Sequence, residues 1–82
     1  MTKHAIRLNI EALDEAVRAV ANKDGKRPTR LLLVDKLPIS RGTLYYWINH
    51  GITPKGLLQI EEVSGVPRER LAPEFFRNDE AA

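Results

Sequence analysis

Helix-capping residues and helix breakers recur along this chain at short intervals, and this spacing constrains the fold more than any other feature. The expected N-caps are Asn9, Thr29, Ser40 and Thr53, and the expected exits or breaks are Gly25, Pro38, Gly51 and Gly65. Pro54 suits the first position of a helix, where its missing N–H has no role, and Gly51 suits a left-handed helix exit. No segment alternates as a half-buried strand would.

Apolar residues between these breaks repeat at helical spacing, which predicts one buried face per helix. The expected inward residues are Ile10, Leu13, Val17, Val20 and Ala21, then Leu33, Val34 and Leu37, then Leu44, Trp47 and Ile48, then Leu57, Leu58, Ile60 and Val63. The helices are expected over about residues 10–22, 30–37, 41–50, 54–64 and 66–71. The predicted fold is therefore all-α, a compact bundle of about five short helices.

The length and composition suit one small domain. We assign residues 1–82 to it and expect residues 1–8 and 77–82 to fray. The chain has no cysteine, which excludes disulfides and thiolate metal sites. No apolar run is long enough to cross a membrane, and the N-terminus lacks the apolar core of a signal peptide. We expect a cytoplasmic protein.

The net charge of +2 is small, but the charges are unevenly distributed. Residues 1–50 hold nine Lys/Arg and five Asp/Glu, whereas residues 51–82 hold four and six. The basic residues are densest between Lys23 and Arg41. Such clustering is typical of a phosphate-binding surface, although a solvated loop and helix face explains the charges alone more simply.

The segment at about residues 29–50 is a helix-turn-helix candidate, because two short helices are separated by a tight turn. The motif needs apolar residues on the first helix and one apolar residue in the turn. The second helix needs two apolar residues that are three positions apart. The residues in these positions are Leu33, Val34 and Leu37, then Ile39, then Leu44 and Trp47. All of them are apolar, as the motif requires.

The opposite side of the second helix carries side chains suited to the DNA major groove. Arginine can bond a guanine edge, asparagine an adenine edge, and a tyrosine ring can contact a thymine methyl group. The residues expected to read bases are Ser40, Arg41, Gly42, Tyr45, Tyr46 and Asn49. Those expected to contact the DNA backbone are Lys26, Arg27, Thr29, Arg30, Thr43 and Lys55. Three of these positions have alternatives. Arg41 contacts either DNA or a surface carboxylate. Gly42 either allows close approach of a base or phosphate or is merely tolerated. Tyr46 faces either DNA, the core edge or a second protomer.

The stretch LPISRGTLYYWINHGITPKGLLQIEEVSGVPRERLAPEFF resembles the small Cro-type repressors of lambdoid phages and their YdaS-like prophage relatives. The resemblance covers about residues 29–76. It implies a lambda-repressor-like DNA-binding domain that dimerises on a palindromic operator in duplex DNA and represses transcription in a phage or prophage switch. It also implies that the recognition-helix residues named above read that operator. Pro38 stands where the family usually has glycine, so the turn geometry is expected to differ.

Three other functions are weighed against this one. An excisionase or recombination directionality factor would show a β-wing after the second motif helix. An antitoxin-type regulator would use Phe75 and Phe76 on a partner protein. Catalysis is not expected, because His4 and His50 lie in different segments and no metal-spaced cluster or cofactor motif appears. The candidate dimer contacts are Leu71, Phe75 and Phe76, with closure of the core as the alternative role for these residues. No cofactor, metal or small-molecule substrate is expected.

Overall fold

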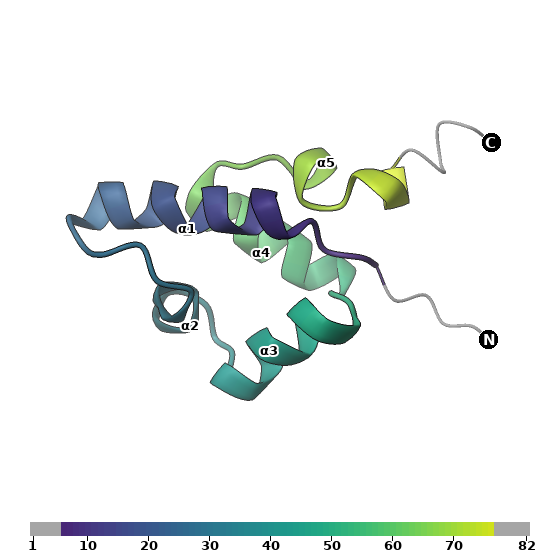
Figure 1. The fold of residues 1–82 in the computed structure, drawn as a ribbon, viewed down its shortest axis with the longest axis horizontal. Coiled ribbons are helices and arrows are strands. Elements are labelled where there is room, and N and C mark those ends of the chain that lie inside the picture. The colour runs from purple at the N-terminus through teal and green to yellow at the C-terminus, as the bar shows by residue number, and fades with distance from the viewer. Residues whose placement is uncertain (1–5, 77–82) are drawn as a thin grey trace.

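The computed structural model describes residues 6–76 of the chain, which form an all-α globule without a sheet in that range (Figure 1). The helices are α1 (Ile10–Asp24), α2 (Leu31–Lys36), α3 (Arg41–His50), α4 (Pro54–Ser64) and α5 (Arg68–Leu71). Residues 73–76 add a further helical turn. The prediction of a compact all-α fold is confirmed.

The long helices α1 and α4 pack against each other and form the centre of the molecule (Figure 1). Helix α5 contacts both of them on one side. Helix α2 contacts α1 on the other side, and α3 packs against α2. As a result α3 lies along an edge of the globule, away from α1 and α5, as the ribbon shows.

Side-chain caps start three of the helices, as predicted. The Asn9 Oδ1 accepts a bond from the Ala12 N–H at 2.9 Å, and the Ser40 Oγ accepts one from the Thr43 N–H at 3.1 Å. The Thr53 Oγ1 accepts one from the Gly56 N–H at 3.0 Å. Each bond satisfies a helix N–H that has no partner within its own helix, so these local signals fix where the helices begin.

Two predicted helix ends differ in the structure. Thr29 does not cap α2; the helix begins at Leu31 after Arg30, and no side chain caps it. The first amides of α2 instead bond to backbone carbonyls three residues back, those of Leu32 and Leu33 to Thr29 and Arg30. Gly51 has φ 132 and ψ 157, an extended conformation that only glycine adopts readily, rather than the left-handed helical one.

Residues 6–8 are ordered, so the prediction that residues 1–8 fray is wrong for this part. Ile6 and Leu8 are buried in the core. The Ile52 N–H donates to the Ile6 carbonyl at 2.9 Å, in an isolated antiparallel bridge. This segment passes beside the α3–α4 turn and holds it in place. The other residues expected to fray, 1–5 and 77–82, lie outside the described part of the chain.

The core is apolar throughout and includes most of the predicted inward residues. Two predictions are wrong: Ile10 and Leu58 are 37% and 47% exposed. Leu32, which was not predicted, is buried, while Val34, Ile39, Ile48 and Val63 are partly buried against the core. The spacing of apolar residues thus predicted the buried face of each helix, but the predicted limits of that face differ from the observed ones by about one residue.

Candidate functional site

Helix α3 is anchored by Leu44, which is fully buried, and Trp47, which is 7% exposed. The Trp47 ring fits over Gly56 of α4. A Cβ atom at position 56 would lie 2.8 Å from Trp47 Cζ2 and 2.9 Å from Ile52 Cγ1. Only a glycine allows this packing, which joins α3, the α3–α4 turn and α4. The sequence patterns did not indicate this role for Gly56, because it depends on a ring from another helix.

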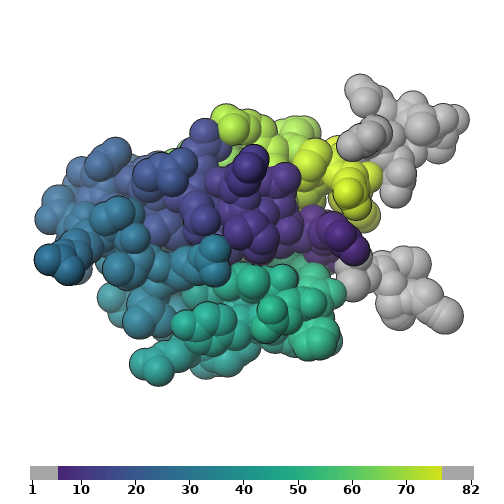
Figure 2. Space-filling model, in the orientation of Figure 1, coloured from purple at the N-terminus to yellow at the C-terminus, as the bar shows by residue number. Residues whose placement is uncertain are grey.

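The opposite face of α3 is exposed to solvent. Tyr45 and Tyr46 are 46% and 55% exposed, and Arg41, Gly42 and Asn49 are exposed as well. In the space-filling view the α3 segment forms an edge of the molecule (Figure 2). The predicted base-reading residues of α3 therefore share one accessible face, arranged by the helical repeat.

Ser40 lies at the start of this face and is already used within the protein. Its Oγ accepts the Thr43 N–H and lies 3.1 Å from the Thr43 Oγ1. Thr43 as a whole is half-buried, and its contact with the Ser40 hydroxyl is exposed to solvent. A contact from either hydroxyl to a ligand has to coexist with this cap.

Tyr46 is supported from the next turn by His50. Their ring centroids are 4.8 Å apart and the rings are nearly perpendicular, at 87°. Edge-to-face packing of this kind holds an exposed ring in one orientation. The place of His50 beside Tyr46 was not predicted, although a spacing of four residues makes two side chains neighbours on a helix.

An open groove of about 930 Å³ runs beside α3. Ser40, Gly42, Thr43, Tyr46 and His50 form one wall, and the α3–α4 turn forms the other. That turn contributes Gly51, Ile52, Thr53 and Pro54, and Trp47 lies at the base. The lining residues include no Asp or Glu.

Several predicted backbone contacts lie outside α3. Lys26, Arg27 and Thr29 are exposed in the loop between α1 and α2, and Lys55 is exposed in the first turn of α4. None of Lys26, Arg27, Arg41 and Lys55 forms an ion pair with the described residues. Their charges are therefore not neutralised by close partners in this part of the chain.

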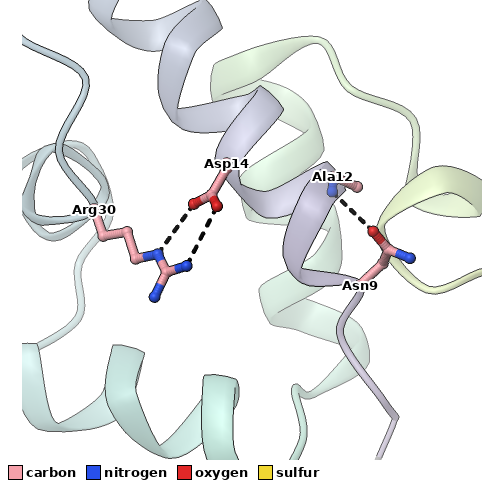
Figure 3. Close-up of polar contacts among 4 residues, drawn as sticks. All are labelled: Asn9, Ala12, Asp14 and Arg30. Carbon is pink, nitrogen blue, oxygen red and sulfur yellow. Dashed lines mark hydrogen bonds and ion pairs between the residues drawn. The ribbon is translucent and has the colours of Figure 1, made fainter.

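Arg30, also predicted to contact the DNA backbone, makes an internal ion pair. Its Nε and Nη2 donate to the two Asp14 carboxylate oxygens at 3.0 and 3.3 Å (Figure 3). These bonds raise the pKa of the Arg30 guanidinium. The electrostatic interaction with nearby Tyr45 raises the same pKa by a smaller amount. The pair ties the start of α2 to α1, so Arg30 helps hold α2 in place.

A second ion pair ties the end of α2 to the end of α1. Lys36 Nζ lies 2.7 Å from Asp24 Oδ2. The hydrogen bond from Lys36 lowers the pKa of the Asp24 carboxyl below its ordinary value. Helix α2 has only six residues and no side-chain cap, so contacts at both of its ends are important for its position.

The residues expected to form a dimer do not share one surface. Leu71 is fully buried and contributes to the core, so it is not available for a contact between protomers. Phe76 is partly buried against the core, whereas Phe75 is 39% exposed. The two rings pack edge to face with centroids 5.1 Å apart.

Two negative findings apply to residues 6–76. No group of three or more histidine, acidic or cysteine side chains is arranged to hold a metal ion. None of the helices in this range has both the length and the apolar run that crossing a bilayer needs.

Comparison with models of protein families, with curated proteins and with solved structures gave no match. The function proposed below depends on the residues and geometry of α3 and on the resemblance described above.

Proposed function

We propose that this protein binds duplex DNA through the exposed face of α3 and acts as a transcriptional repressor of the Cro type, in a phage or prophage switch. In this proposal α2 and α3 form the helix-turn-helix and α3 enters the major groove. The observation that most directly supports this proposal is that α3 has a buried face and an exposed face. Leu44 and Trp47 fix the helix to the core, while Arg41, Tyr45 and Asn49 are exposed on the other side.

The distribution of charge around α3 supports a polyanionic partner. The sequence has no Asp or Glu from Lys36 to Ile60, a stretch that includes all of α3 and the turn after it. Arg41 and Lys55 are exposed in this stretch and make no ion pair with the described residues. A surface without acidic side chains does not repel phosphate groups, so modest positive charge is sufficient to attract DNA.

The element that follows α3 favours a repressor over an excisionase. A winged excisionase would place a β-hairpin after the recognition helix. Here α4 (Pro54–Ser64) follows directly, and the described residues contain no strand beyond the single bridge between Ile6 and Ile52.

A homodimer on a palindromic operator is part of the proposal. One domain of this size offers little area for specific binding, and two-fold DNA sites match two-fold proteins. Phe75 is the predicted dimer residue that remains exposed. Sedimentation of the Phe75→Ala variant, with and without DNA, tests its part in the dimer. If Phe75→Ala instead abolished binding to a partner protein and left DNA binding intact, the antitoxin-type function would replace the repressor.

The direct test is selection of randomised duplexes on the purified protein. Enrichment of one palindromic sequence supports the proposal, and equal retention of all sequences contradicts it. Repression is then measured with a reporter gene placed behind the selected sequence. If the protein binds the operator but reporter expression does not change, the protein binds DNA without acting as a repressor.

Arg41→Ala is expected to weaken binding to the selected operator by about 1–3 kcal/mol and to relax the preference at one base pair. The reason is the loss of a guanidinium that can donate two bonds to one guanine. Arg18→Ala is the matched control, because Arg18 is also an exposed arginine but lies on α1. Fluorescence anisotropy with single-base operator variants measures both effects. Equal losses in the two variants would show that Arg41 acts only through its charge.

A further inference from the structure

Gly42 is an exposed glycine in the first turn of α3, and the folded chain does not require it. A Cβ atom there would meet only the Ser40 Oγ, at the ordinary contact distance of 3.8 Å. Glycine in a helix is less favourable than alanine. This contrasts with Gly56, where a Cβ atom would overlap Trp47. The absence of a side chain at position 42 therefore calls for an explanation outside the protein.

Two tyrosine rings belong to the same patch of surface. Tyr45 and Tyr46 follow Gly42 by three and four residues, so they are its neighbours on the next turn of the helix. Helical side chains lean toward the N-terminus and cover the preceding turn. Gly42 and Tyr46 line the same open groove, and the Tyr46 ring packs edge to face against His50 with the ring centroids 4.8 Å apart. We call the part of the groove that Gly42 and Tyr46 line the notch: it has one aromatic ring, no side chain at position 42 and no acidic lining residue.

We propose that this notch receives the 5-methyl group of a thymine in the major groove. The inference rests on the proposed function, since it needs α3 to face duplex DNA. The thymine methyl is the apolar group that a base pair presents in that groove, and a notch with an aromatic ring and no side chain at position 42 matches it. Gly42 and Tyr46 are then specificity-determining residues, with Gly42 admitting the methyl group and Tyr46 contacting it.

Asn49 lies on the same exposed face of α3 as Gly42 and could read a different base pair of the same site. It lies seven residues after Gly42, two turns along the helix, and an asparagine amide can bond an adenine edge bidentately. Tyr46 and Gly42 also line the groove beside α3, which contains no acidic residue. The surroundings of the notch are therefore open and free of negative charge, as close approach of a base pair requires.

The experiment replaces thymine by uracil at each position of the selected operator, one at a time. Uracil keeps the base pairing and removes only the methyl group. We expect one position per half-site at which the unmodified protein binds about fourfold more weakly, the factor that corresponds to burying one methyl group. Gly42→Ala and Tyr46→Ala should lose this difference, binding the thymine and uracil operators equally. Arg18→Ala, on α1, should keep it.

Gly42→Ala is expected to fold, because the added Cβ has free space, and thermal unfolding checks this. If the protein selects an operator but binds every uracil variant as tightly as the original, the inference is wrong and the proposed function stands. If both variants keep the fourfold difference, a different residue contacts the methyl group and the notch is also excluded. If the protein selects no duplex sequence, both the proposed function and this inference are wrong.

Discussion

Gly42 and Gly56 have opposite surroundings, and the two residues predict opposite effects of the same substitution. Gly56→Ala places a methyl group 2.8 Å from the Trp47 ring. Overpacking of this kind costs about 1–3 kcal/mol, which exceeds the roughly 0.5–1 kcal/mol that alanine restores in a helix. We expect a net loss of stability of about 1 kcal/mol or more. Urea unfolding followed by Trp47 fluorescence measures it, and unchanged stability would contradict the packing of this ring over Gly56.

Gly42→Ala should instead raise the free energy of unfolding by about 0.5–1 kcal/mol, because it restores helix propensity without a clash. The same urea titration measures it, with Gly56→Ala as the contrasting substitution. If the notch at Gly42 receives a thymine methyl group, the more stable variant will bind operator DNA less well. A variant that is less stable than the original would show that Gly42 has a structural role after all.

At the scale of the elements, α2 depends on ion pairs at both ends, and one of them gives a pH dependence. The hydrogen bond from Lys36 lowers the pKa of Asp24 in the folded protein. The folded state therefore binds the Asp24 proton less readily than the unfolded chain does. This stabilisation is complete above the ordinary aspartate pKa of about 4 and is lost as the pH falls through it and through the lower folded value.

Asp24→Asn should accordingly lower Tm at pH 7 and make little difference at a pH well below the folded pKa of Asp24. Asp35→Asn is the control, since Asp35 is exposed on α2 and forms no ion pair with the described residues. Thermal unfolding of the three proteins across the acid range measures the difference. An Asp24→Asn effect that did not change with pH would have to come from something other than this ion pair.

The helix starts were predictable from sequence where the cap is local. Asn9, Ser40 and Thr53 each bond to an amide three residues later, so a short window of sequence contains the whole signal. Thr29 misled because the start of α2 depends on the pairing of Arg30 with Asp14, sixteen residues away. Ile6 and Leu8 were missed for a similar reason, since their order comes from Ile52 and the core.

The candidate site was predictable in part. The helical repeat assigned the two faces of α3, because each depends only on the spacing of residues within ten positions. Two features depend on tertiary packing and were not predicted: the fit of Trp47 over Gly56 and the use of Arg30 within the protein. For Leu71 the sequence left a dimer contact and a core position open, and its full burial decides for the core.

At the scale of the whole molecule, the basic and acidic residues are separated although the net charge is only +2. The loop between α1 and α2 presents Lys26 and Arg27, which are exposed and form no ion pair with the described residues. Acidic side chains gather elsewhere, as on the outer side of α1, where Glu11, Asp14 and Glu15 lie near Arg18 and Arg70. A DNA duplex would therefore be attracted to one side of the molecule and not to the other.

This separation predicts how single charges affect the salt dependence of DNA binding. Lys26→Ala should weaken binding to operator and random duplexes by the same factor, because a phosphate contact does not depend on base sequence. It should also reduce the slope of log K against log salt by about 0.9, the value for one phosphate contact. Arg18→Ala removes the same charge from α1 and should leave the slope nearly unchanged. Titrations from low to moderate salt measure both slopes. A loss confined to the operator would assign Lys26 to base recognition, and equal slopes in all proteins would place the α1–α2 loop away from the DNA.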